Sequence, residues 1–210
     1  MTLSPTAPKT NGIQITPACN QDYLELTRLW ERAVRVTHTF LSEEAIVAIR
    51  HDMFDIHLRS VDLFVARFVP ETPLSTMNAE GLKATQACIK KATQAILTDQ
   101  PCNSETPLCH KDTTSDAPPI PAESILLGFI GLVETHIGML FIDPDFHRMG
   151  VGQLLIHHAL RQGATSVDVN EQNPKAHAFY TAMGFIQKGR SSHDSQGNPF
   201  PILHLHFAPQ

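Results

Sequence analysis

The chain has 210 residues, enough for one domain with a substantial core, and a formal net charge of −5 at pH 7. This acidic balance and the lack of any lysine or arginine run argue against binding to a nucleic-acid backbone. No apolar run approaches the roughly 20 residues of a membrane-spanning helix, and residues 1–12 contain no hydrophobic segment of the signal-peptide type. We therefore expect a cytoplasmic protein that binds neither nucleic acid nor membranes.

The first third of the chain predicts a strand, two helices and a second strand. Residues 1–12 are expected to be a disordered lead-in, followed by a short strand at 13–17. Asn20 is expected to cap a helix whose apolar residues keep helical spacing. Ser42, followed by two glutamates, predicts the start of the next helix, because acidic side chains suit the positive end of the helix dipole. A strand is predicted at 61–69.

Composition changes after Pro70, where threonine, proline, serine, glutamine and asparagine become frequent. We interpret 71–122 as an insertion into a single domain that spans 13–208. Within it only 82–97 has amphipathic helical spacing, at Leu82, Ile89, Ala92 and Ile96. Long loops are usually functional or disordered, so two interpretations stay open. The insertion is either disordered or peripheral, or it is a lid or partner-binding element.

Seven further elements are predicted after the insertion, with clear boundaries. In chain order they are strands at 125–134 and 137–143, a helix at 150–161, a strand at 166–169, a helix at 174–183, and strands at 185–188 and 202–207. The second of these helices has Asn173 at its N-cap, Pro174 at its first position and Gly184 just past its end. The order β-α-α-β-(insertion)-β-β-α-β-α-β-β predicts an α/β or α+β domain, a mixed sheet with helices on both faces.

A glycine-bearing bend joins the second of these strands to the helix that follows, in the stretch FIDPDFHRMGVGQLL at 141–155. Backbone N–H groups at the positive end of a helix suit a phosphate group. A P-loop is excluded because Gln153 follows Gly152 where a lysine is required. A dinucleotide-binding turn fits poorly, since Leu155 replaces the third glycine, although Asp168 lies about where a ribose-binding acid is expected.

The histidines and cysteines do not predict a metal site. The chain has 12 histidines, but adjacent His157 and His158 diverge on a helix, and His204 and His206 share a strand face without a nearby carboxylate or cysteine. Scattered surface histidines are the simpler interpretation. The four cysteines show no CxxC spacing and are expected to be free thiols.

Two motifs resemble the GCN5-related N-acetyltransferases, the GNAT family. HRMGVG at 147–152 resembles the Q/R-x-x-G-x-G/A turn that cradles the pyrophosphate of acetyl-coenzyme A, and NPKAHAFYTAMGF at 173–185 resembles N-x-x-A-x-x-F-Y-x-x-x-G-F. They occur in the family's order, with a strand between them. THTFLS at 37–42 and the tail GRSSHDSQGNPFPILHL are similar to a subgroup of small bacterial members. The resemblance covers roughly 13–70 and 124–208 and leaves the insertion without a counterpart.

The resemblance implies a single GNAT-type domain with a twisted mixed sheet of about six to seven strands, whose splayed central strands bind acetyl-coenzyme A. It implies the coenzyme as cosubstrate and no metal. His147 and Arg148 depart from the usual motif residues, yet both still offer backbone N–H groups, and Gly150 and Gly152 are intact. The coenzyme-binding residues implied are Leu140, Phe141, Ile142, His147, Arg148, Met149, Gly150, Val151, Gly152, Asn173, Phe179 and Tyr180.

The resemblance assigns Tyr180 as the general acid that protonates the coenzyme A thiolate. A phenol suits this because its ordinary pKa, about 10, lies near that of a thiol, about 8.5. The alternative is an aromatic core residue, as expected for Phe179 beside it. Asn173 would contact the coenzyme as well as cap its helix.

The base and the acceptor pocket are less sharply indicated. Glu134 and His136, at the turn that enters the coenzyme strand, are the candidate bases, and either could instead be a solvated turn residue. His38 and Phe40 are the candidate acceptor-pocket residues, with a packed aromatic at a helix end as the alternative.

The expected activity is transfer of an acetyl group from acetyl-coenzyme A to a primary amine, either a protein lysine or a small molecule, by a monomer or homodimer. One alternative is a non-catalytic acyl-coenzyme A-binding module whose insertion recruits a partner; Tyr180 argues against it, because binding alone needs no phenol there. Another is a metal- or nicotinamide-dependent enzyme.

Overall fold

The computed structural model describes residues 12–70, 79–98, 124–195 and 197–208. The lead-in expected at 1–12 therefore lies outside the described residues, apart from Gly12, which begins the first strand.

The core of the fold is one seven-stranded sheet in the order β1-β2-β3-β4-β5-β7-β6. Neighbouring strands are antiparallel except β4 and β5, which are parallel. The strands are β1 (Gly12–Pro17), β2 (Asp62–Val69), β3 (Ile125–Val133), β4 (His136–Ile142), β5 (Ser166–Asn170), β6 (Phe185–Ser191) and β7 (Ile202–Phe207). The prediction of a mixed sheet of six to seven strands is confirmed.

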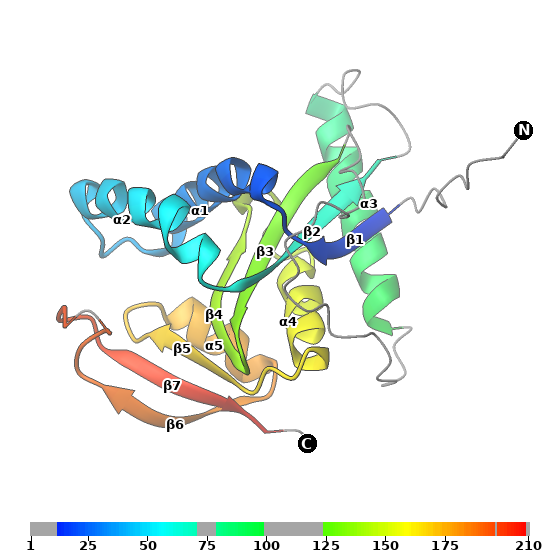
Figure 1. Cartoon of the computed structure of the whole chain (residues 1–210). Coiled ribbons are helices and arrows are strands. Elements are labelled where there is room, and N and C mark those ends of the chain that lie inside the picture. The colour runs from blue at the N-terminus through cyan, green and yellow to red at the C-terminus, as the bar shows by residue number, and fades with distance from the viewer. Residues whose placement is uncertain (1–11, 71–78, 99–123, 196, 209–210) are drawn as a thin grey trace, which may run out of the picture.

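Helices cover both faces of this sheet (Figure 1). They are α1 (Tyr23–Thr37), α2 (Glu43–Asp55), α3 (Ala79–Thr98), α4 (Val151–Arg161) and α5 (Pro174–Ala182). One buried cluster joins α1 and α2 to one sheet face and includes Trp30 and Phe129. The other joins α3, α4 and α5 to the opposite face and includes Ile89, Leu155 and Tyr180.

Local sequence fixes most helix starts as predicted, with one exception. The Ser42 side chain accepts a hydrogen bond from the Ala45 N–H at 3.3 Å, so it caps α2. The cap predicted at Asn20 is wrong, because Asn20 lies inside a short 3-10 turn that precedes α1. Asp22 instead accepts the Cys19 N–H at 2.8 Å and pairs with the buried Arg67 at 2.9 Å.

The amphipathic helix expected at 82–97 is confirmed as α3, and its buried face includes only part of the apolar set that predicted it. Leu82 is 41% exposed, whereas Thr85, Ile89 and Thr93 are buried. A threonine can face a packed interior when its hydroxyl bonds a carbonyl, and Thr93 does so. Apolar spacing alone therefore identifies Ile89 but not the two buried threonines of this stripe.

Candidate active site

Strands β4 and β5 diverge in the middle of the sheet. They pair only at His136 with Ser166 and at Ile137 with Val167. Beyond that point β5 continues to pair with β7 as far as Asn170, while β4 continues along β3 to Ile142. From Ile137 to Ile142 the free edge of β4 is about 17 Å long at about 3.3 Å per residue. This split opens a space between two strands whose facing backbone groups are not paired with each other.

A bulge lies where the split begins. Gly131 pairs with Met139 but Leu132 pairs with Ile137, so Gly138 is an extra residue in β4. A glycine inside a strand, such as Gly138, is the sequence signal for such a bulge.

The backbone groups that face the split follow from the antiparallel ladder. Asp143 N–H donates to the Leu127 carbonyl at 2.9 Å, so the groups of Asp143 face β3. Along an antiparallel strand, residues whose backbone groups bond the neighbouring strand alternate with residues whose backbone groups do not. The backbone groups of Phe141, two residues before Asp143, therefore also face β3. Leu140 and Ile142 therefore direct their backbone groups toward the split.

The side chain of His147 uses one of these groups. Its Nε2 lies 3.1 Å from the Ile142 carbonyl oxygen, so the ring folds back over the end of β4. The imidazole therefore contacts the end of β4, and the N–H groups of Leu140 and Ile142, with the Leu140 carbonyl, lie on the side of the split.

The bend after β4 has the geometry of an anion-binding turn. Arg148 and Gly150 both have positive φ, 61° and 86°. The first intrahelical bond of α4 runs from the Leu154 N–H to the Gly150 carbonyl at 3.1 Å, which leaves the N–H groups of residues 151–153 without a helix acceptor. Backbone N–H groups at a helix start attract anions.

At Gly152 the helices α4 and α5 approach each other closely. A Cβ at Gly152 would lie 3.2 Å from Phe179 Cζ, so α5 packs directly against the first turn of α4. This packing leaves little room for a side chain at Gly152. Phe179 is partly buried against the main core and sets the spacing between the two helices that flank the split.

The start of α5 confirms the predicted cap. Asn173 is buried, and its side-chain oxygen accepts the Ala176 N–H at 3.1 Å, with Pro174 at the first helical position. Gly184, just past the end, has φ 90°.

Tyr180 lies on the inner side of α5. Its ring is 6% exposed and packs edge-on against Phe179 and Phe185, at centroid distances of 5.3 and 5.5 Å. Burial raises the pKa of the phenol above its ordinary value. The group is therefore protonated throughout the working range, which is the state that a proton donor needs, while its acidity is lower than that of a free phenol.

The two candidate bases occupy different environments. Glu134 is exposed in the tight turn between β3 and β4, with φ 54°. His136 is half-buried at the closed end of the split, and its Nδ1 lies 3.0 Å from Ser166 Oγ.

A second polar chain lies on the same sheet face as His136 and Ser166. His204 contacts Asp168 through Nδ1 and Ser191 through Nε2, each at 2.7 Å. Asp168 is two residues from Ser166 along β5, so both side chains project from one face. Sequence reasoning considered His204 only as a metal ligand and did not identify this chain.

Aromatic side chains from three separate segments meet above this face. His38 lies 5.5 Å from Phe40 and 6.5 Å from Phe141 between ring centroids, and Phe40 lies 5.7 Å from Phe200. These four partly buried residues form what we call the aromatic wall. Burial lowers the pKa of His38, so the wall is uncharged near neutral pH. Phe200, in the connection between β6 and β7, was not predicted as a site residue.

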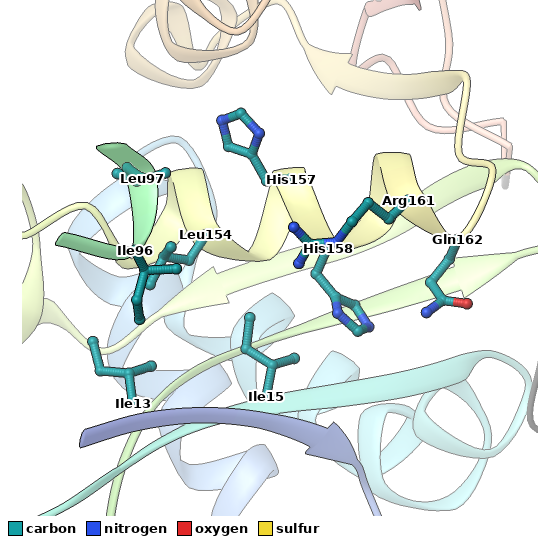
Figure 2. Close-up of a pocket in the computed structure, with 9 residues that line it drawn as sticks. All are labelled: Ile13, Ile15, Ile96, Leu97, Leu154, His157, His158, Arg161 and Gln162. Carbon is teal, nitrogen blue, oxygen red and sulfur yellow. The ribbon is translucent and has the colours of Figure 1, made fainter. Parts of the chain in front are cut away.

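Two cavities lie beside these elements. One, of about 310 Å³, is enclosed by β1, α3 and α4; Figure 2 shows His158 on α4, with Ile13 and Ile15 on the opposite wall. The other, of about 500 Å³, lies between α1 and the segment after β4, where Arg32 pairs with Asp143 at 2.9 Å and with Asp145 at 2.7 Å. Neither includes a residue between Ile137 and Ile142, so neither is the split itself.

Within the described ranges, no cluster of three or more metal-ligating side chains is found. Cys19 and Cys88 are free thiols, while Cys102 and Cys109 lie outside the described residues. No described helix is long and apolar enough to span a bilayer.

Comparisons with known proteins agree with this geometry. The family described as "Acetyltransferase (GNAT) domain" matches residues 120–200. The peptidyl-lysine N-acetyltransferase YjaB of Salmonella typhimurium is 31% identical over 194 residues, covering 92% of this chain and 97% of the relative. The solution structure of apo-form YjaB from Escherichia coli superposes with a TM-score of 0.61 at 29% identity, covering 94% and 99%.

A more distant structure shares the fold and holds a ligand. The PaiA N-acetyltransferase of Thermoplasma acidophilum, solved in complex with coenzyme A, gives a TM-score of 0.52 at 14% identity, covering 91% of this chain and 97% of that one.

Proposed function

This chain belongs to the GNAT family of N-acetyltransferases, and from that premise we propose that it transfers the acetyl group of acetyl-coenzyme A to the side-chain amine of a lysine in a peptide or protein. The observation that carries the proposal is the split between β4 and β5, which ends beside the left-handed turn at Gly150. The acceptor class is supported by two YjaB relatives, each 31% identical and covered over 97% of its length.

The coenzyme would bind mainly to backbone groups. Its diphosphate would accept hydrogen bonds from the N–H groups at the start of α4, where the helix dipole favours negative charge. Its pantetheine arm would lie along the free edge of β4 and bond Leu140 and Ile142 as an additional strand would. Arg148, exposed on the turn, adds a cation near the phosphates.

The reaction needs one bond formed and one broken. The neutral amine attacks the thioester carbonyl and the new C–N bond forms. The nitrogen, positively charged after attack, releases its extra proton to water, and the C–S bond breaks to leave a thiolate. Tyr180 would give this thiolate a proton, and the phenol would regain one from solvent. Backbone N–H groups of β4 would stabilise the negative charge that develops on the carbonyl oxygen.

We assign the proton acceptor to His136 rather than Glu134. An amine with a pKa near 10.4 is almost entirely protonated at neutral pH, so a base is needed before attack. His136 lies at the closed end of the split on the face of the aromatic wall, and Ser166 fixes one ring nitrogen. Glu134 lies in the exposed turn outside the split.

Replacing His136 by glutamine tests this choice. We expect kcat/KM for the amine to fall by about 10²-fold, because general-base catalysis contributes on that scale. Glu134→Gln is the matched control, and a larger loss in that variant than in His136→Gln would reverse the assignment.

The aromatic wall suits the acceptor side chain. A lysine has four methylene groups that can pack against rings, and an ammonium that is attracted to ring faces before it loses its proton. Phe40, Phe141 and Phe200 offer such faces without a competing charge.

The activity is tested by coenzyme A release. The purified chain would be incubated with acetyl-coenzyme A and a lysine peptide, its Nε-acetylated form, or spermidine, with free thiol and peptide mass followed together. We expect thiol release matched by gain of one acetyl group on the unmodified peptide only. Faster turnover of spermidine than of any lysine peptide would replace the proposed acceptor class with polyamines.

A further inference from the structure

Helix α3 lies against the turn that we assign to the coenzyme, although α3 belongs to the insertion. Its buried stripe of Thr85, Ile89 and Thr93 faces the main core, and Ile89 is fully buried there. Contacts between α3 and both β1 and α4 hold the helix on this face of the sheet (Figure 1). The family match at residues 120–200 begins after α3.

The closest contact is between Thr93 and the residues just before α4. The Thr93 hydroxyl donates to the Met149 carbonyl. Its oxygen also lies 3.0 Å from the Ile89 carbonyl oxygen and 2.9 Å from the Lys90 carbonyl oxygen of its own helix. Thr93 is 1% exposed, so water does not replace this bond. A partly buried carbonyl that loses its donor also loses stability when it is left unpaired.

Gly150 provides the space that this contact requires. A Cβ at Gly150 would lie 3.1 Å from both Thr93 Cβ and Thr93 Oγ1, and 3.5 Å from Leu97 Cδ1. The residue also has φ 86°. Gly150 is therefore needed twice, for its left-handed backbone and for the close approach of α3.

The bond to Met149 sets the direction of a specific N–H group. A trans peptide is planar, with its C=O and N–H pointing in opposite directions. The peptide that carries the Met149 carbonyl also carries the Gly150 N–H, so an oxygen held toward α3 directs that N–H away from α3. This N–H then points to the side of the turn that α3 leaves open.

A second contact holds the segment just before the turn. Gln86 Nε2 donates to the Asp145 carbonyl at 2.8 Å, two helical turns before Thr93 on the same stripe of α3. The carboxylate of Asp145 is held from the other side by Arg32 at 2.7 Å. Helix α3 therefore contacts the connection between β4 and α4 at both of its ends.

We propose that Thr93 is a positioning residue for coenzyme binding, which acts by fixing the Met149–Gly150 peptide so that the Gly150 N–H faces the diphosphate. The inference rests on the proposed function, because it concerns the same turn. It gives the insertion a role in this chain, as a support of the coenzyme site from outside the motif.

The test compares three single variants in the full chain. Thr93→Val removes the donor at nearly constant volume, and Thr93→Ser keeps it. Thr98→Val makes the same change on the same helix at an exposed site, where the hydroxyl bonds the Gln94 and Ala95 carbonyls of its own helix. The dissociation constant for acetyl-coenzyme A would be measured by calorimetry, and KM and kcat by thiol release.

We expect Thr93→Val to raise the dissociation constant and the KM for acetyl-coenzyme A by roughly tenfold, the effect of one well-placed hydrogen bond, with little change in kcat at saturation. Thr93→Ser should restore wild-type affinity, and Thr98→Val should not alter it. A role in packing alone would lower the melting temperature without this selective loss of affinity.

Several results would overturn the inference. Unchanged affinity in Thr93→Val would remove the positioning role, and tighter binding would mean that α3 obstructs the coenzyme. Both results presuppose a wild-type chain that binds acetyl-coenzyme A. A wild-type chain that binds none would overturn the proposed function, and the role of Thr93 with it.

Discussion

The two sides of the split between β4 and β5 are built from different parts of the protein. The side that we propose for the coenzyme consists of backbone groups of β4 and the turn before α4, fixed by Gly150, Gly152 and their buried neighbours. The side that we propose for the acceptor consists of partly buried rings from the α1–α2 connection, from β4 and from the β6–β7 connection. Binding through backbone groups depends on the local conformation of the chain, which requires particular residues at particular positions. Binding through side chains can change when the loops that carry those side chains change.

The largest expected effect is on the rate of the chemical step, and it concerns neither coenzyme binding nor acceptor binding. Tyr180→Phe should lower kcat by about 10²–10⁴-fold, because it removes the proposed proton donor. Acetyl-coenzyme A binding and stability should be nearly unchanged, since a phenylalanine ring preserves the packing against Phe179 and Phe185.

The matched control for this variant is Tyr23→Phe, which changes the only other tyrosine of the chain, on α1 under Arg59. Turnover should stay near the wild-type value there. Near-normal kcat in Tyr180→Phe would show that Tyr180 is only a core aromatic residue.

A smaller effect, confined to the coenzyme side, is expected from Gly152→Ala. The added methyl group would lie 3.2 Å from Phe179 Cζ, so α5 or the start of α4 must shift. We expect unfolding free energy to fall by about 1–3 kcal/mol and acetyl-coenzyme A to bind about tenfold more weakly. Denaturant titration and calorimetry would measure the two changes.

Gly189→Ala is the control for Gly152→Ala, because its new Cβ would meet His204 Cδ2 at an ordinary 3.4 Å on the edge strand. Unchanged coenzyme affinity in Gly152→Ala would mean that the turn tolerates displacement. The coenzyme side would then not depend on particular residues more strictly than the acceptor side does.

The smallest effect is expected on the acceptor side. Phe200→Ala should raise the KM for a lysine peptide by about three- to tenfold and leave acetyl-coenzyme A affinity unchanged, because it removes one ring of the aromatic wall. Phe200→Leu keeps an apolar contact and tests whether the ring face itself matters. A change in coenzyme affinity in either variant would contradict the separation of the two sides.

The backbone geometry of the proposed coenzyme side could be predicted from the sequence because its residues are constrained locally. Gly150 has the positive φ that only glycine adopts easily, and Asn173 with Pro174 forms a helix start of recognisable composition. The order of strands and helices followed from apolar periodicity in the same way.

The rest depends on contacts between distant parts of the chain. Phe200 joins Phe40 across 160 positions, and no local pattern in the sequence indicates that pair. The buried face of α3 was only partly predicted, because Thr93 faces inward through a hydrogen bond to Met149, which apolar spacing does not reveal. The chain from Asp168 through His204 to Ser191 likewise exists only after β5, β6 and β7 pair.

The most direct test of the central claim is a crystal structure of this chain with acetyl-coenzyme A. The account predicts a diphosphate on the N–H groups at 150–153 and a pantetheine arm between β4 and β5, bonded to Leu140 and Ile142, with its sulfur toward Tyr180. A coenzyme bound in another part of the molecule, with β4 and β5 closed upon each other, would contradict it.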